Sequence, residues 1–124
     1  MTLSHQEIFQ RYVYAGAITR NPPAVADLFT DDGVYEAPVE GLRLVGRDAI
    51  ETGVRAIQAR PGPEGTLNAG ATGYVLHDTA DPDVFIAEID AVLDGPDGST
   101  TVSLVQIFRM SGDKIRSLRD YFQS

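Results

Sequence analysis

The stretch KIRSLRDYF, residues 114–122, decides how the rest of the chain is interpreted. It combines β-branched and aromatic residues without glycine or proline, which predicts a β-strand. Side chains alternate between the two faces of a strand, so Leu118, Asp120 and Phe122 share one face. Asp120 therefore lies between two apolar residues, where a core residue is expected. A carboxylate in apolar surroundings holds its proton unusually tightly, which suits a general acid or base.

Structural roles for Asp120 fit the same position. If the last strand frays at its end, the carboxylate is hydrated, and a nearby arginine could also pair with it. The sequence alone leaves these alternatives open.

The stretches before this strand predict a meandering antiparallel sheet. Residues 66–77, 84–93 and 100–110 are expected strands, and Gly70 and Gly73 weaken the first of them. The sequences GPDG (95–98) and SGD (111–113) are typical of the turns that join neighbouring strands. These strands and residues 114–122 would follow one another in a single sheet.

The first half of the chain predicts helices. The sequence SHQE at 4–7 is a capping box, and apolar residues then recur at helical spacing to residue 20. The sequence NPP at 21–23 starts a second helix, residues 33–37 form a short strand that Pro38 stops, and 47–58 is helical again. Residues 39–46 are expected as a loop and 60–65 as a linker. Helices followed by a meander indicate an α+β fold with helices packed on one face of the sheet.

Composition limits the function classes. The 124 residues are expected to form one domain, 1–124, with a formal net charge of −8 and no cysteine. The negative charge argues against nucleic acid and membrane partners, and no apolar run is long enough to span a bilayer. Residues 1–20 lack the features of a signal peptide, so we expect a cytoplasmic protein.

Both faces of the strand at 84–93 are largely apolar. Helices can cover only one face of the sheet, so the other face needs a partner. We therefore expect a homodimer, with the choice of face left open.

Four polar residues interrupt apolar strand faces: Glu88, Asp90, Gln106 and Asp120. A curved sheet could bring them to one pocket, where two carboxylates would divide their protons and leave one acid and one base. Buried polar groups must otherwise satisfy one another. In that case Glu88 would pair with Arg116 or Arg119, and Gln106 would bond to backbone.

Tyrosines are the other candidate donors. Tyr12 and Tyr14 on the first helix and Tyr35 on the first strand could reach such a pocket, although a core role fits each of them. His5 and His77 are far apart and are expected to be exposed. Their spacing to carboxylates predicts no metal site, and the chain has no phosphate loop or nucleophile elbow.

Several of these stretches resemble the nuclear-transport-factor-2-like superfamily, which includes ketosteroid isomerase, limonene epoxide hydrolase and SnoaL-like polyketide cyclases. They are LFTDDGVYEAP (28–38), VGRDAI (45–50), AEID (87–90) and DKIRSLRDYF (113–122). The resemblance spans nearly the whole chain. It implies a cone-shaped curved antiparallel sheet with N-terminal helices on its concave face.

The ending of the chain is similar to that of limonene epoxide hydrolase. The resemblance implies that Asp120 activates water, Asp90 protonates the epoxide oxygen and Tyr35 positions the water. The sequence departs from that pattern at Glu88, where the family has arginine, and at Ala37, where it has asparagine.

Resemblance to ketosteroid isomerase is weaker. Its base falls on Ala37 and its acidic proton donor on Gln106, so only a helix-1 tyrosine, Tyr12 or Tyr14, is retained. SnoaL-like cyclases, which resemble the chain in the last strand, use one aspartate as acid/base, and Asp120 is compatible with that role.

We therefore expect an acid/base enzyme that needs no cofactor and acts on a mostly apolar, oxygenated small molecule by ring closure, isomerisation or hydrolysis. Asp120 would be the acid/base, with Asp90, Tyr35 and Tyr12 assisting. The substrate would also contact Glu88, Gln106, Tyr14 and an apolar set made of Phe29, Phe108, Leu118 and Phe122. The alternative is a non-catalytic module that binds a small molecule or docks a partner. A docking module would fill the cavity beside Asp120 with Phe29, Phe108 and Phe122.

Overall fold

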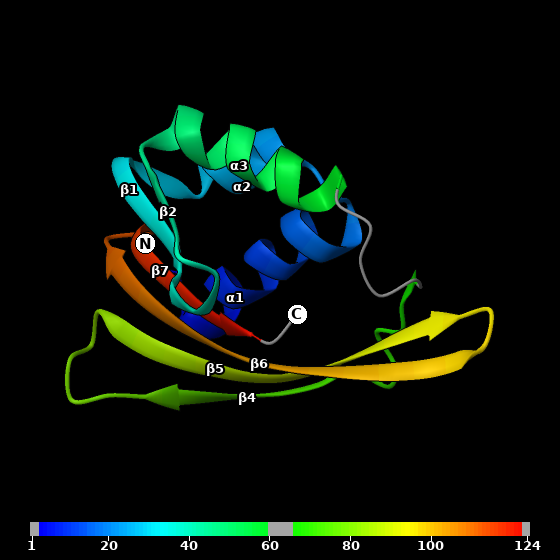
Figure 1. Ribbon diagram of the computed structural model, residues 1–124. Helices are drawn as coiled ribbons and strands as arrows, with labels where there is room; N and C mark the ends of the chain where they lie inside the picture. The colour runs from blue at the N-terminus through cyan, green and yellow to red at the C-terminus, as the bar shows by residue number, and fades with distance from the viewer. Residues whose placement is uncertain (1–2, 60–65, 123–124) are drawn as a thin grey trace.

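The computed structural model describes residues 3–59 and 66–122 (Figure 1). The linker predicted at 60–65 lies outside the described residues. None of the described helices is long and apolar enough to cross a membrane.

The N-terminal helices begin at the predicted caps. Helix α1 (His5–Val13) starts at a capping box in which the Ser4 hydroxyl accepts from the Glu7 amide at 3.1 Å, and the Glu7 carboxylate accepts from the Ser4 amide at 3.2 Å. It continues into one π-helical turn, η1 (Tyr14–Ile18). Helix α2 (Pro22–Asp27) begins at Asn21, whose side chain accepts from the Ala24 amide. The predicted helix of residues 5–20 is therefore confirmed over most of its length.

The other elements follow in the order β1 (Phe29–Ala37), a 3-10 turn η2 (Pro38–Glu40), β2 (Leu42–Val45), α3 (Arg47–Ala59), β3 (Thr66–Leu67), β4 (Gly73–Asp78), β5 (Val84–Gly95), β6 (Gly98–Ser111) and β7 (Lys114–Phe122). The predicted strand at 66–77 is split into β3 and β4, with Gly70 in the interruption and Gly73 at the start of β4. Strand β2 was predicted as loop. It is short and pairs only with the edge of β1.

The strands form one curled sheet in the order β2-β1-β7-β6-β5-β3, and β4 also pairs with β5. All pairs are antiparallel except β1 with β7, which run parallel. Figure 1 shows the helices lying on the concave, inner face of the sheet. The expected α+β architecture is therefore confirmed, and the parallel pair brings β1 beside β7.

The core lies between the helices and the inner face of the sheet. Its largest fully buried side chains include Phe9, Phe29, Phe85 and Phe108. The rings of Phe85 and Phe108 stack with centroids 4.6 Å apart, on neighbouring strands. This packing fixes which face of β5 and β6 is the inner one.

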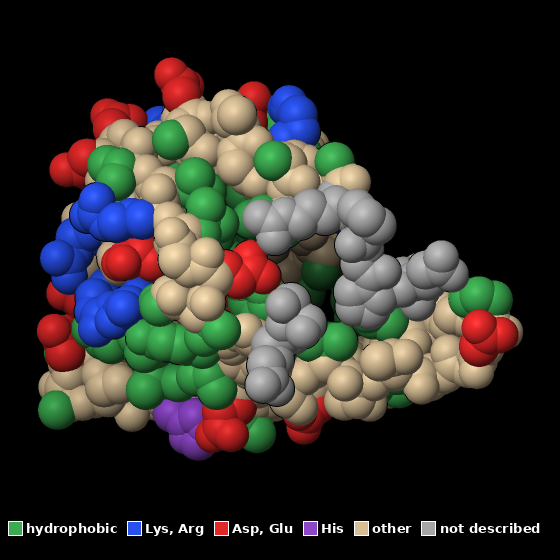
Figure 2. Space-filling view, viewed as in Figure 1, with side chains coloured by type: hydrophobic (Ala, Val, Ile, Leu, Met, Phe, Trp, Pro, Cys, Tyr) green, Lys and Arg blue, Asp and Glu red, His purple; other side chains and the backbone are tan. Residues whose placement is uncertain are grey.

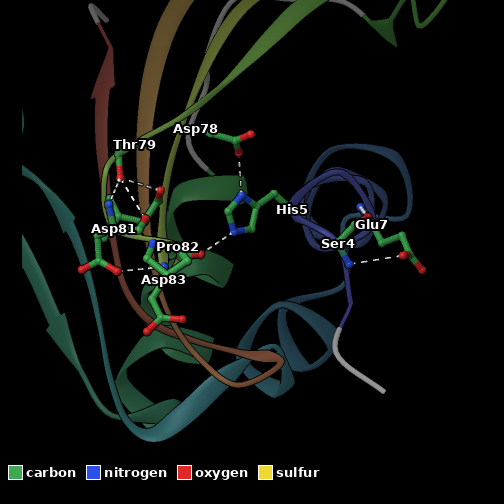
Figure 3. Close-up of polar contacts among 9 residues, drawn as sticks. Ser4, His5, Glu7, Asp78, Thr79, Asp81, Pro82 and Asp83 are labelled. Carbon is green, nitrogen blue, oxygen red and sulfur yellow. Dashed lines mark hydrogen bonds and ion pairs between the residues drawn. The ribbon is translucent and has the colours of Figure 1, made fainter.

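His5 fastens the start of α1 to this core (Figure 3). Its ring stacks on Phe85 at 4.5 Å, while its two nitrogens lie 3.0 Å from an Asp78 carboxylate oxygen and 2.9 Å from the Pro82 carbonyl oxygen. The side chain is only 24% exposed, so the expectation of an exposed His5 was wrong. The contacts hold α1, and with it Tyr12, over the sheet.

Candidate active site

A cavity of about 620 Å³ lies between the helices and the inner face of the sheet. Figure 2 shows this side of the molecule, where the surface is hollowed between the helices and the strands. The sheet contributes Tyr35, Leu67, Tyr74, Ile89, Ala91, Leu104, Gln106 and Asp120 to the wall, and the helices contribute Phe9, Tyr12, Val13, Tyr14, Val25, Val54 and Ile57. Most of these side chains are apolar, so the polar groups among them stand out.

Asp120 is the charged group of this wall within residues 3–59 and 66–122. It is 7% exposed, and its Oδ2 accepts a hydrogen bond from the Tyr35 hydroxyl at 2.7 Å. Its Oδ1 is buried and has no hydrogen-bond partner among the described residues. Asp120 is therefore shielded from solvent and pairs with no arginine among the described residues, and its Oδ1 keeps an unused hydrogen-bond acceptor.

Burial raises the pKa of Asp120 to about 6. The hydrogen bond from Tyr35 and the nearby Gln106 amide both favour the ionised form and lower the pKa of Asp120, whereas the charge of Glu40 raises it. With a pKa of about 6, the Asp120 carboxyl group gains and loses its proton near neutral pH. This is the property that general acid/base chemistry requires.

Gln106 faces Asp120 from the neighbouring strand. The two residues are directly paired in the β6–β7 register, and Gln106 is 7% exposed. Their proximity lowers the pKa of Asp120, although no side-chain bond closes on Oδ1. The predicted meeting of Gln106 and Asp120 in one pocket is thus observed.

Tyr35 reaches Asp120 because β1 runs parallel to β7. Tyr35 pairs with Leu118 in that register, two positions before Asp120 on the same inner face. Burial, the neighbouring Tyr12 and the Asp120 carboxylate all raise the pKa of Tyr35 above the usual range of tyrosine. Its hydroxyl therefore remains a donor and keeps Oδ2 occupied.

Tyr12 reaches the same end of the cavity from α1. Its ring packs edge-on against Phe108 with centroids 5.5 Å apart. Burial and the Asp120 charge raise the pKa of Tyr12 well above its usual range, so the hydroxyl stays protonated. A second protonated hydroxyl thus lies near the carboxylate.

Sequence reasoning missed Glu40. It lies in the short turn η2, within the stretch 39–46 that was expected to be a loop. Its charge raises the pKa of both Asp120 and Tyr35. No periodicity or motif marks a single glutamate in a turn, so only the folded chain reveals this influence.

Glu88 and Asp90 do not join Asp120. They pair with Val105 and Ser103 of β6, on the face opposite to Gln106, and both are exposed. Glu88 lies 2.5 Å from His77 Nε2, not beside Arg116 or Arg119, and Asp90 accepts from the Ser103 hydroxyl at 2.6 Å. The predicted convergence of all four polar residues was wrong for these two, because the strand alternation that turns Ala87 and Ile89 inward turns them outward.

The predicted apolar wall also needs correction. Phe29, Phe108 and Leu118 are fully buried, and they pack in the core beneath the cavity without lining it. Phe122 packs against the same core and is not part of the wall either. Tyr14 does line the cavity, at a 59% exposed position on η1. The large aromatic side chains therefore leave the space beside Asp120 open.

No group of three or more histidine, cysteine, aspartate or glutamate side chains that could hold a metal ion occurs within the described ranges. The polar side chains that meet at one end of the cavity are those of Asp120, Gln106, Tyr35 and Tyr12.

The family model for the SnoaL-like domain matches residues 9–118. Among solved structures, a protein with a ketosteroid isomerase-like fold from Catenulispora acidiphila, in complex with trimethylamine, is 21% identical with a TM-score of 0.71, and the alignment covers 98% of this chain and 88% of that chain. No curated protein matches the chain.

Two further solved structures have the same fold. A candidate isomerase from Bacillus subtilis is 17% identical with a TM-score of 0.73, over 95% of this chain and 85% of that chain. A candidate polyketide cyclase from Pseudomonas putida is 17% identical with a TM-score of 0.71, over 98% of this chain and 92% of that chain. These likenesses confirm the predicted cone-shaped fold of the nuclear-transport-factor-2-like superfamily.

Proposed function

The chain belongs to the SnoaL-like domain family, and from this premise we propose that it is a small acid/base enzyme with Asp120 as its proton-transfer group. The proposed substrate is a mostly apolar, oxygenated small molecule held in the cavity. The proposed reaction is an isomerisation or a ring closure carried out by side chains alone. The observation that supports it is a buried carboxylate with one oxygen held by Tyr35 and the other unpartnered among the described residues, at the wall of an apolar cavity.

In this proposal Oδ1 of ionised Asp120 takes a proton from the carbon beside a substrate carbonyl. The C–H bond breaks, an O–H bond forms at Oδ1, and the electron pair left on the substrate forms an enolate. Where a carbon–carbon double bond is conjugated with this enolate, return of the proton to the far carbon of the dienolate shifts the double bond and gives an isomer. Attack of the enolate carbon on a second carbonyl closes a ring, and the resulting alkoxide takes the proton back from Asp120.

The two tyrosines have different roles in this scheme. Tyr35 holds Oδ2, so Oδ1 is the oxygen that moves the proton. Tyr12 keeps its own proton and would donate a hydrogen bond to the enolate oxygen as negative charge develops there. A donor placed where charge appears lowers the barrier without taking part in bond changes.

Epoxide opening by an aspartate pair is not part of the proposal. That chemistry, implied by the resemblance to limonene epoxide hydrolase, needs Asp90 beside Asp120. Asp90 lies on the outer face and bonds to Ser103, so these two carboxylates do not share the cavity.

Deuterium exchange tests the proposal without knowledge of the natural substrate. Cyclohexanone and 2-decalone are incubated with the protein in D2O, and exchange of the hydrogens beside the carbonyl is followed by NMR. We expect the parent protein to accelerate exchange over buffer, and Asp120→Asn to slow it by about 10²- to 10⁴-fold, the usual contribution of a positioned base. Equal exchange rates for parent and variant would contradict the assignment of Asp120.

A second candidate is small-molecule binding without chemistry. It is favoured by the trimethylamine complex of the Catenulispora acidiphila protein, and a carboxylate among tyrosine rings is a setting that attracts organic ammonium ions. Saturable binding of trimethylammonium that is lost in Asp120→Asn, together with no exchange of any ketone, would favour this candidate. The open cavity supports either small-molecule function over a partner-docking module, which would have filled it.

A further inference from the structure

The wall of the cavity carries negative charge without a balancing cation. Among residues 3–59 and 66–122, the wall contains no lysine, arginine or histidine, and Asp120 is its one acidic residue. The charge of Glu40 also acts on this end of the cavity, since it raises the pKa of Asp120. A molecule in the cavity therefore meets negative charge and no positive side chain of the described wall.

The buried end of the cavity suits a carbonyl oxygen. Gln106 is buried beside Asp120, and Tyr12 contributes a hydroxyl that stays protonated. The Gln106 amide and the Tyr12 hydroxyl are neutral donors, and a carbonyl oxygen is a neutral acceptor. A ketone can therefore be bound at this end without bringing a new charge into the cavity.

Polar side chains elsewhere in the wall offer little to a charged group. Thr72 Oγ1 accepts from the Val92 amide at 3.0 Å, and Gln58 Nε2 donates to the Gly16 carbonyl oxygen at 3.2 Å. Both side chains are thus already bonded within the protein. The rest of the wall is mostly apolar, and an ion buried there without a partner loses its hydration with nothing in return.

We infer that the cavity selects uncharged ketones and rejects molecules that carry a carboxylate or phosphate group near the carbonyl. The inference deepens the proposed function, on whose site it rests, by naming the charge class of the substrate. The ketone enters with its oxygen towards Tyr12 and Gln106, and its apolar body contacts the apolar part of the wall.

The proposed proton transfer keeps the charge of the cavity constant. Before the transfer, Asp120 is ionised and the ketone is neutral. After the C–H bond breaks and Oδ1 takes the proton, Asp120 is neutral and the enolate holds the negative charge. A neutral substrate thus leaves one negative charge in the cavity at both stages. An anionic substrate would place two there at both stages, and like charges at close range repel strongly.

A matched pair of ligands tests the inference through binding alone. Methyl 3-oxocyclohexanecarboxylate and 3-oxocyclohexanecarboxylate share one ring and one ketone and differ in charge. Their dissociation constants are measured by NMR titration of the full chain at about pH 8, where the ligand acid and Asp120 are both ionised. The parent should bind the ester at least about 30-fold more tightly than the acid, because like charges set against each other disfavour a complex.

Two variants show whether Asp120 is the source of this preference. Asp120→Asn removes the charge from the wall and should reduce the preference for the ester by about fivefold or more. Asp90→Asn makes the same change on the outer face, where Asp90 bonds to Ser103, and should leave the preference within about twofold of the parent's. Circular dichroism confirms that each variant is folded, and Asp120→Ser replaces Asp120→Asn if that variant does not fold.

Binding and exchange separate this inference from the proposed function. Deuterium exchange beside the ketone of the ester is followed in the same samples in D2O. Preferential binding of the ester without any exchange would contradict the acid/base function and support the charge selection. Equal or tighter binding of the acid, or failure of the ester to bind, would overturn the inference. A preference that Asp120→Asn leaves unchanged would overturn it as well.

Discussion

The two faces of one sheet carry similar polar residues in very different states. On the inner face, Asp120 lies in an apolar wall with one oxygen unpartnered among the described residues, and burial raises its pKa. On the outer face, Glu88 and Asp90 are exposed and each has a polar neighbour, His77 and Ser103. A carboxylate within an apolar strand pattern therefore indicates a candidate acid or base only once its face is known, because only the face covered by helices is shielded from water.

The largest expected effect is a loss of catalytic rate, which should follow a change on the inner face and not one on the outer face. Asp120→Asn on β7 and Asp90→Asn on β5 make the same chemical change on opposite faces of the sheet. We expect the first to slow ketone deuterium exchange by about 10²- to 10⁴-fold and the second to leave the rate within about twofold. A comparable loss in Asp90→Asn, measured in the same NMR assay, would show that the outer carboxylate also serves the reaction.

Removal of the Tyr12 hydroxyl is expected to have the next largest effect. Tyr12→Phe keeps the ring packed against Phe108 but removes the donor proposed for the enolate oxygen. The loss of one such donor typically costs about 10²-fold in rate. Tyr14→Phe is the matched control, since it removes a hydroxyl at an exposed part of the cavity wall. Equal rates for the two variants would remove Tyr12 from the scheme.

The pH dependence of stability should also distinguish the faces. The pKa of Asp120 is about 6 in the folded chain and lies near 4 when unfolded, so the folded state binds more protons between these values. This stabilisation is fully present below the unfolded pKa and is lost as pH rises through the folded pKa. Asp120 should therefore contribute about 2 kcal/mol less to the free energy of unfolding at pH 7 than at pH 4.

Urea denaturation of the parent and Asp120→Asn at both pH values measures this term. The variant should gain stability relative to the parent by about 2 kcal/mol between pH 4 and pH 7. A difference between parent and variant that does not change with pH would mean that Asp120 is an ordinary, hydrated carboxylate.

The smallest effect is expected on the outer face. Glu88→Gln removes a charge from an exposed side chain whose neighbour His77 is also exposed. Such exposed pairs contribute about 0–1 kcal/mol, so denaturation should detect a change of less than about 1 kcal/mol. Destabilisation well beyond that value would place Glu88 in a buried network that the strand register does not allow.

These contrasts explain how far the sequence could predict the site. The strand at 114–122 and the place of Asp120 on an apolar strand face were predictable, because alternation within one strand is a local property, whereas the burial of Asp120 stayed open. The face of Glu88 was not, since both faces of β5 carry apolar residues and either could have met the helices. The choice depends on Phe85 stacking on Phe108, a contact between strands that no single strand reveals.

The partners of Asp120 are also products of the tertiary fold. Tyr35 lies 85 residues away along the chain and reaches Asp120 through the parallel pairing of β1 with β7, whereas the meander predicted only antiparallel neighbours. The influence of Glu40 arises from a turn with no recognisable pattern. The α+β architecture could thus be derived from local signals, and the site's electrostatics could not.

The proposed function depends most directly on the protonation of one carboxyl group. Carbon-13 NMR of aspartate-labelled protein, with the Asp120→Asn variant to assign the signal, follows the Asp120 carboxyl from about pH 3 to pH 9. We expect a midpoint near 6 that moves upward in Tyr35→Phe, because that variant loses a hydrogen bond that favours the ionised form. A midpoint at or below about 4, unchanged in Tyr35→Phe, would contradict the buried, tyrosine-held base on which the proposed function stands.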